Sequence, residues 1–116
     1  MPRIKNKKSI KEQIDRMVKR IVRKFKPEQI ILFGSQARGD VRPDSDVDLL
    51  VVMDVAEGSE WDKAIEIGVA LDDLPVPMDI IVTRPSEFAW RKEYVGTIER
   101  VAFREGKMLY AIRQQG

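Results

Sequence analysis

The chain has 116 residues, 43% of them hydrophobic, which is typical of a single domain with a core of moderate size. It contains no cysteine, so disulfides and thiolate metal sites are excluded. It also contains no histidine, which excludes histidine general bases, Ser-His-Asp triads and histidine-rich zinc sites. Any bound metal must therefore be held by oxygen, which favours Mg2+, Mn2+ or Ca2+.

The net charge of +2 hides an asymmetry along the chain. Residues 1–26 carry 11 Lys and Arg against 2 Asp and Glu, or +9, whereas residues 27–116 carry 10 against 17, or −7. A basic arm can contact RNA or an acidic partner, although a solvated helix face is the simpler explanation. No apolar run approaches the ~20 residues of a membrane span, and the N-terminus lacks the apolar stretch of a secretory signal. We therefore expect a cytoplasmic protein with no membrane partner.

The N-terminal part predicts a loose segment followed by a helix. Residues 1–8 are basic and expected to be flexible, and residues 9–116 are expected to form one domain. Ser9 and Glu12 have the spacing of a capping box, and the helix that follows is expected to end at Pro27. Its apolar positions recur at helical spacing and are expected to face the core: Ile10, Ile14, Met17, Val18, Ile21, Val22 and Phe25.

Strands and helices alternate after Pro27. The predicted strands are 28–33, 47–53, 78–83 and a short edge strand at 107–110, and the predicted loops are 40–45 and 54–58. The predicted helical stretches are a turn at 35–38 closed by Gly39, a helix from Ser59 as its cap to about 74, and a region over 85–105 that breaks near Gly96 and stops at Gly106.

Two expectations concern the apolar residues of these helices. The helix over 59–74 is expected to turn one set inward: Trp61, Ala64, Ile65, Gly68, Val69 and Leu71. The large aromatic residues are expected to belong to the core rather than to a base-stacking surface: Trp61, Trp90, Tyr94 and Phe103.

The most informative segment links the first two strands. Gly34-Ser35 follows one apolar run, and Asp46-Val47-Asp48 opens the next. Residues i and i+2 of a strand point to the same face, so Asp46 and Asp48 can reach the same metal site. Asp79 interrupts an apolar strand, where an acid is costly, and it can join the pair if the second and third strands are neighbours.

The residues before the acidic pair suit a phosphate. Glycine at Gly34 lets the backbone pass close to a triphosphate, and the backbone amides after it, with the Ser35 hydroxyl, supply donors. Arg38 can reach a phosphate or form an ion pair within the fold. Ser45 is expected to brace the turn before Asp46.

Three segments resemble one known family: Leu32–Gly39, Asp44–Leu49 and Arg104–Tyr110. Their pattern is similar to the minimal nucleotidyltransferases, the smallest branch of the DNA polymerase beta superfamily, and the likeness spans about residues 10 to 110. The resemblance implies an α/β, palm-like nucleotidyltransferase fold with a small mixed sheet and helices mainly on one face.

The resemblance also implies a set of roles. The catalytic and metal-binding residues are expected to be Asp46, Asp48 and Asp79, with the paired acids bridging two Mg2+ ions and Asp79 binding the catalytic one. The nucleotide-binding residues are expected to be Gly34, Ser35 and Arg38. The implied reaction moves AMP from ATP, or the monophosphate of another NTP, to an acceptor hydroxyl.

Many members of this branch are antitoxins paired with a HEPN-domain toxin, so the expected acceptor is a side chain such as tyrosine on a HEPN partner. Little chain follows the third strand to build an acceptor-binding domain, which agrees with an acceptor carried by another protein. Two alternatives stay open. One is a non-catalytic subunit that neutralises or scaffolds a partner by contact, although the three acids argue against it. The other is a small-molecule or RNA nucleotidyltransferase, since the basic N-terminus is compatible with RNA.

Overall fold

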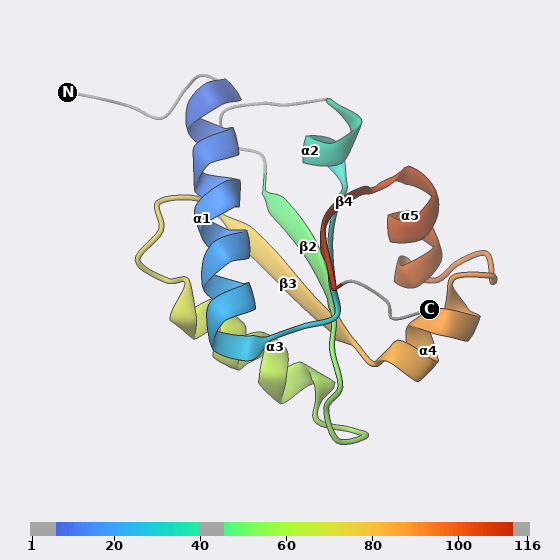
Figure 1. Ribbon diagram of the computed structural model, residues 1–116. Coiled ribbons are helices and arrows are strands. Elements are labelled where there is room, and N and C mark those ends of the chain that lie inside the picture. The colour runs from blue at the N-terminus through green and yellow to red at the C-terminus, as the bar shows by residue number, and fades with distance from the viewer. Residues whose placement is uncertain (1–6, 40–45, 113–116) are drawn as a thin grey trace.

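The computed structural model describes residues 7–39 and 46–112, which form an α/β structure around one mixed sheet (Figure 1). Its strands are β1 (Gln29–Phe33), β2 (Val47–Val52), β3 (Met78–Thr83) and β4 (Lys107–Ala111). Its helices are α1 (Lys7–Phe25), α2 (Ser35–Arg38), α3 (Glu60–Ala70), α4 (Pro85–Arg91) and α5 (Ile98–Glu105). The predicted loop over 40–45, with Ser45, and most of the predicted flexible N-terminus lie outside the described residues.

The strands are arranged in the order β3-β2-β1-β4. The central pair, β1 and β2, is antiparallel, β4 adds to β1 in the antiparallel sense, and β3 is parallel to β2. A parallel neighbour requires a crossover, and α3 supplies it between β2 and β3. The predicted strands and the mixed sheet are therefore confirmed, including the short edge strand at the C-terminal end.

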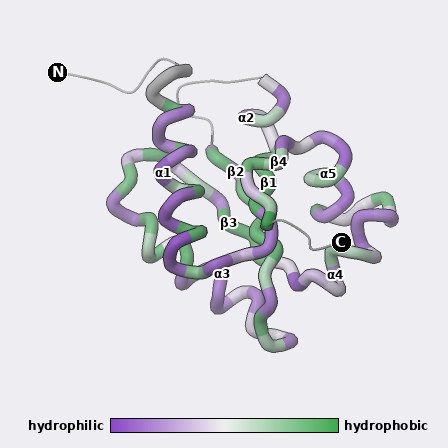
Figure 2. Tube along the Cα trace, viewed as in Figure 1, coloured by the Kyte–Doolittle hydropathy of each residue, from purple (hydrophilic) through white to green (hydrophobic). Residues whose placement is uncertain are grey.

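Both faces of the sheet are covered by helices. The larger core lies where the two longest helices, α1 and α3, pack against one face, and the shorter α4 and α5 cover the other (Figure 1). Successive residues of β2 point to opposite faces, so Leu49 joins the larger core and Leu50 the smaller one. This double burial explains why the central strands are hydrophobic along most of their length (Figure 2).

Helix α1 confirms its predicted apolar face but not its predicted start. Met17 and Ile21 are fully buried, and Ile10 is nearly so. The helix begins at Lys7, so Ser9 lies inside its first turn and the predicted capping box is wrong. Neither α1 nor any other helix among the described residues has an apolar stretch long enough to cross a membrane.

Helix α3 corrects three expectations. It ends at Ala70 rather than near residue 74. Ser59 precedes it, but its hydroxyl donates to the Ala56 carbonyl (2.6 Å) and does not cap the helix. The buried stripe runs through Ala64, Ile67 and Leu71, while three residues expected to face inward are exposed: Trp61 (77%), Ile65 (52%) and Val69 (63%).

The other aromatic residues are also at the surface, so their assignment to the core is wrong. Trp90 is 47% exposed, Tyr94 59% and Phe103 50%. Two edge-to-face contacts hold them, one between Trp90 and Tyr94 (5.5 Å between ring centroids) and one between Phe103 and the buried Phe88 (6.4 Å). They therefore pack on the outside of α4 and α5 rather than between the helices and the sheet.

The break and the stop of the C-terminal helical region are confirmed. Gly96 has a φ of 97° in the segment between α4 and α5. Gly106 ends α5, and its N–H donates to the Ala102 carbonyl (2.9 Å). A Cβ at Gly106 would overlap the carbonyl oxygens of Ala102 and Leu32, so the close approach of α5 to β1 requires glycine there.

A buried carboxylate joins α4 and α5 to the end of β3. Glu99 accepts a hydrogen bond from the Thr83 hydroxyl (2.7 Å) and one from the Arg91 Nε (3.2 Å), with which it also forms an ion pair. Because these partners satisfy the carboxylate, its burial is compatible with a stable fold. On the opposite face of the sheet, Arg20 of α1 pairs with Asp73 after α3 and donates to the Ala70 carbonyl (3.0 Å).

Candidate active site

The candidate residues meet at one end of the sheet, where β1 ends and β2 and β3 begin. The register places Asp48 opposite Phe33, the last residue of β1, so Gly34 follows directly beside it. The register between β2 and the parallel strand β3 places Asp48 beside Asp79. Three segments that are far apart in the sequence therefore contribute to a single location.

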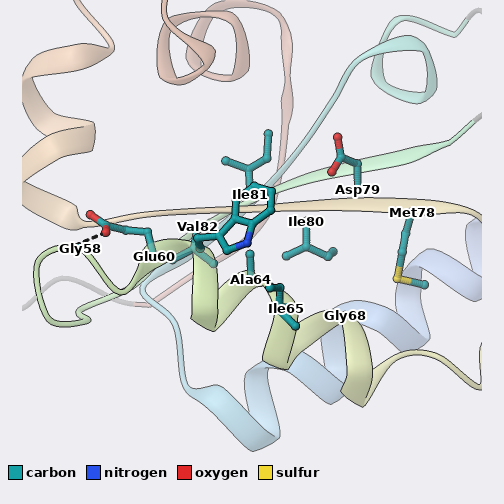
Figure 3. Close-up of a pocket in the computed structure, with 11 residues that line it drawn as sticks. Gly58, Glu60, Ala64, Ile65, Gly68, Met78, Asp79, Ile80, Ile81 and Val82 are labelled. Atoms are coloured by element: carbon teal, nitrogen blue, oxygen red, sulfur yellow. Dashed lines mark hydrogen bonds between the residues drawn. The ribbon is translucent and has the colours of Figure 1, made fainter.

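The acids of β2 and β3 project from the same face of the sheet. Asp48 shares its face with Leu50, and Asp79 shares its face with Ile81, and both apolar residues pack in the smaller core beneath α4 and α5. In Figure 3, Asp79 and Ile81 point to one side of β3, whereas Met78 and Ile80 point to the other. Adjacent strands are about 4.8 Å apart, so the carboxylates of Asp48 and Asp79 are near neighbours.

Asp48 is electrostatically disfavoured as a carboxylate. Burial raises the pKa of its carboxyl above the usual value, and the negative charges of Asp79 and Asp46 raise it further. The Arg38 guanidinium partly offsets this effect by lowering the pKa of Asp48. Asp48 is half-buried, whereas Asp46 and Asp79 are exposed. A cation placed at this cluster would relieve the repulsion, since an opposite charge favours the ionised form of each acid.

Both the backbone conformation at residue 34 and the space beside the acid cluster favour glycine there. Its φ of 75° and ψ of −156° lie in a region that is essentially restricted to glycine. A Cβ built at Gly34 would overlap the Asp48 Oδ2 atom. The backbone after β1 therefore passes directly against the carboxylate, and a side chain on residue 34 would require the Asp48 carboxylate to move.

Ser35 and Arg38 are the first and last residues of the short helix α2. The amides of Ala37 and Arg38 both donate to the Gly34 carbonyl (3.1 Å each), which fixes the turn after Gly34. Ser35 is half-buried and Arg38 is exposed. All six candidate residues are thus brought to the same end of the sheet, with the basic group of Arg38 close enough to affect Asp48.

The carboxylates do not form a preorganised metal cage. Across residues 7–39 and 46–112, no three His, Cys, Asp or Glu side chains are grouped closely enough to hold an ion as they stand. The donor set nevertheless consists of carboxylate oxygens alone, which is the chemistry of Mg2+ and Ca2+ ligands. The register that sets Asp48 beside Asp79 is the structural observation that fits a divalent cation here, and the raised pKa of the Asp48 carboxyl beside Asp79 and Asp46 agrees with it.

A groove of about 800 Å³ lies beside the cluster, between α3 and β3. Asp79 lines it together with Ile65 of α3 and Ile80 of β3 (Figure 3). Trp61 of α3 is also among the lining residues. Sequence reasoning missed this feature because Trp61 and Ile65 were assigned to the core. The signal that could have revealed it is the row Trp61, Ile65 and Val69, which has i, i+4 spacing and is separate from the row through Ala64 and Leu71.

Asp48 of β2, with Asp46 just before that strand, thus lies beside the Gly34-Ser35 turn that follows β1. A family model described as Nucleotidyltransferase domain matches residues 14–104, and the chain belongs to that family. The chain is 34% identical over 103 residues to a Methanocaldococcus jannaschii protein named "Putative protein adenylyltransferase MJ0604", covering 89% of this chain and 96% of that protein. The chain is accordingly a minimal nucleotidyltransferase.

Solved structures share the fold. A crystal structure described as a "putative nucleotidyltransferase" from Sulfolobus solfataricus has a TM-score of 0.61 at 24% identity, covering 92% of this chain and 90% of that one. A toxin–antitoxin crystal structure with AMP-PNP has a TM-score of 0.51 at 21% identity, covering 88% and 73%. A mutant of the toxin–antitoxin MntA-HpeT has a TM-score of 0.54 at 20% identity, covering 85% and 73%.

Proposed function

We propose that this minimal nucleotidyltransferase transfers AMP from ATP to a hydroxyl on a partner protein, that it depends on Mg2+, and that it acts as the antitoxin of a HEPN-domain toxin. The observation that carries the proposal is the position of Asp48. It lies beside Asp79, near Asp46, and directly against the backbone of Gly34. A triphosphate bound along the Gly34 turn would therefore have its phosphates next to three carboxylates.

Each group has a distinct role in this proposal. Gly34 allows close approach of the triphosphate, Ser35 donates from its hydroxyl, and Arg38 offsets negative charge at the open side. Asp46, Asp48 and Asp79 would hold Mg2+, with Asp79 nearest the acceptor. Bound Mg2+ supplies Lewis-acid chemistry that activates the acceptor hydroxyl and stabilises the leaving pyrophosphate.

The transfer is a single displacement at the α-phosphorus. The acceptor oxygen forms a bond to that phosphorus, the bond from the phosphorus to the bridging oxygen of the β-phosphate breaks, and pyrophosphate leaves. The hydroxyl proton passes to water. The chain needs no histidine base for this reaction, which agrees with its composition.

The choice of nucleotide and acceptor draws on the comparisons. The curated relative is named as a protein adenylyltransferase, which supports an AMP donor and a protein acceptor. A structural neighbour is a toxin–antitoxin with AMP-PNP, which supports ATP and an antitoxin role. Among the described residues, Asp79 at the acidic end of the sheet also lines an open groove, which supports an acceptor delivered by another protein.

The test first asks whether a neighbouring gene encodes a HEPN-domain protein, as the proposal expects, and then measures the intact mass of that protein after incubation with the purified chain, Mg2+ and ATP. We expect the partner to gain the mass of one or more AMP units on a hydroxyl, and to remain inactive after this chain is removed. GTP, CTP and UTP in parallel samples measure base preference.

Two variants sharpen this experiment. Asp48→Asn should abolish the mass gain, whereas Asp54→Asn, an exposed aspartate beyond the end of β2, should retain it. A partner that is fully inhibited but unmodified by the wild-type chain would instead establish neutralisation by contact alone.

A further inference from the structure

Strand β3 has an open edge. Among the described strands it has a neighbour on one side only, β2. The carbonyls of Pro77 and Thr83 accept hydrogen bonds from the backbone N–H groups of Val47, the first residue of β2, and Met53, which directly follows β2. Because backbone groups of alternate residues point to alternate sides, Met78, Ile80 and Val82 turn their N–H and C=O groups outward. This edge is a template for an additional strand.

The groove between α3 and β3 runs along this edge. Its α3 wall includes Ala64 and Gly68, and a Cβ built at Gly68 would meet nothing within 4 Å, so these small residues leave room. Trp61 and Ile65 line the same groove, yet 77% and 52% of their surfaces are exposed. Such exposed apolar residues beside unpaired strand backbone suit alternate side chains of an added strand.

The groove is continuous with the acid cluster. Asp79 lines the groove (Figure 3). It is also the register partner of Asp48. A segment lying along β3 would therefore pass the position at which the proposed chemistry occurs. Its side chain nearest Asp79 could place a hydroxyl at the α-phosphorus without any further domain.

The surroundings of the groove are strongly acidic. Residues 46–79, which contain β2, α3 and the start of β3, carry ten Asp and Glu and a single Lys or Arg, or −9. Lys63 is paired with Glu66 and Asp73 with Arg20 of α1, whereas the described residues that line the groove include Glu60 and Asp79 and no Lys or Arg. Charge complementarity therefore favours a basic occupant.

We propose that the groove between α3 and the open edge of β3 is the acceptor site, and that it binds an extended, basic, hydroxyl-bearing segment of a partner protein as an additional strand. The inference rests on the proposed adenylyl transfer for its purpose, but the docking itself requires neither nucleotide nor metal. Apolar side chains of the segment pack on Trp61 and Ile65, its basic residues face the acidic rim, and its hydroxyl reaches the Asp79 end.

The test measures peptide binding without nucleotide and with metal chelated. The probe is a fluorescent peptide of about eight residues in which Lys and Val alternate on both sides of a tyrosine. We expect fluorescence anisotropy to detect binding of this peptide, and we expect binding to be lost when glutamate replaces its lysines. Two further peptides carry N-methyl groups, one on its odd-numbered residues and the other on its even-numbered residues. Only one of these two should lose binding. N-methylation removes the backbone donors that a strand edge would use.

A matched pair of variants locates the site. Trp61→Ala should weaken binding by about tenfold or more, because a buried tryptophan anchor commonly carries much of an interface. Trp90→Ala, an exposed tryptophan on α4 outside the groove, should leave the affinity unchanged. Equal losses in both variants, or equal binding of all the peptides, would refute the docking site, and so would the absence of any binding.

The result also separates the two proposals. If the peptide binds but no AMP is transferred to its tyrosine or to the HEPN partner, the docking site is supported and the proposed function is refuted. If AMP is transferred to the partner with no dependence on Trp61, the proposed function is supported and the docking site is refuted. If the wild-type chain self-associates and Trp61→Ala abolishes this association, the occupant is a second copy of this chain, which overturns a partner segment as the ligand.

Discussion

Replacing Gly34 by alanine is expected to destabilise the fold more than replacing Gly39 by alanine, although both glycines have positive φ angles. Gly39 closes α2 in the left-handed region, with φ 84° and ψ 5°, and a Cβ built there meets nothing within 4 Å. Alanine at that position costs only backbone strain, about 1–2 kcal/mol. The comparison therefore separates strain from steric overlap.

Gly34 adds a second cost. Its φ of 75° and ψ of −156° are worth about 1–3 kcal/mol of strain for any other residue. In addition, the new Cβ would overlap the Asp48 carboxylate, which must then move from its place beside Asp79. With a coupling of about 0.5–3 kcal/mol for side chains in contact, the total reaches about 1.5–6 kcal/mol. At about 4 °C for each kcal/mol, the expected fall in Tm is about 6–24 °C, against about 4–8 °C for Gly39→Ala.

A double-mutant cycle measures the overlap directly. Gly34→Ala is introduced into the wild-type chain and into Asp48→Ala, and the free energy of unfolding is determined by urea denaturation followed by far-UV circular dichroism. In the Asp48→Ala background the carboxylate is gone, so Gly34→Ala should cost only its backbone strain. The same cost in both backgrounds would refute the conclusion that Gly34 is required to accommodate Asp48.

Three further predictions concern individual carboxylates. In metal-free buffer, the raised pKa of Asp48 makes the free energy of unfolding fall as pH increases from the ordinary aspartate pKa through the raised folded value. Asp48→Asn should lack this fall and melt at a higher temperature at neutral pH. Superimposable pH profiles of the two proteins in thermal melts would contradict this. Asp79→Asn should retain Mg-ATP affinity within about tenfold, or ~1.4 kcal/mol, by calorimetric titration yet lose turnover, and wild-type turnover would reduce Asp79 to a structural acid. Glu99→Ala should destabilise the fold by about 2–3 kcal/mol because it leaves the Thr83 hydroxyl and Arg91 without their acceptor, whereas the exposed Glu105→Ala should change the urea midpoint little; equal effects would show that the Glu99 contacts contribute nothing to stability.

The acid cluster and the groove are consequences of the same strand order. With β3 at the edge of the sheet, Asp79 has Asp48 on one side and the open groove on the other. The larger core fixes α3 on the opposite face of β3 from the acids, so the helix forms a wall without covering them. This arrangement brings the proposed chemistry to the edge of the protein, where a partner can reach it.

Local patterns in the sequence were sufficient to predict the strands, the apolar face of α1 and the break before α5. These features depend on the spacing of apolar residues and on the positions of glycine and proline within a few residues. Both act on the local backbone independently of distant parts of the chain. The shared face predicted for Asp46 and Asp48 stays a prediction, because Asp46 precedes the first residue of β2. The ends of helices were less predictable: Ser9 and Ser59 have the residue type of a cap, but neighbouring backbone groups decide whether a hydroxyl is used as one.

Only the tertiary structure decided which side of α3 is buried and how the site is assembled. Helix α3 carries two apolar rows, and packing on the sheet selects the row with Ile67 and leaves the row with Trp61 at the surface. The pairing of Asp48 with Asp79, and the overlap that reserves residue 34 for glycine, depend on strand register between segments distant in sequence. No local preference encodes such a register, because it is set by the simultaneous burial of both faces of the sheet.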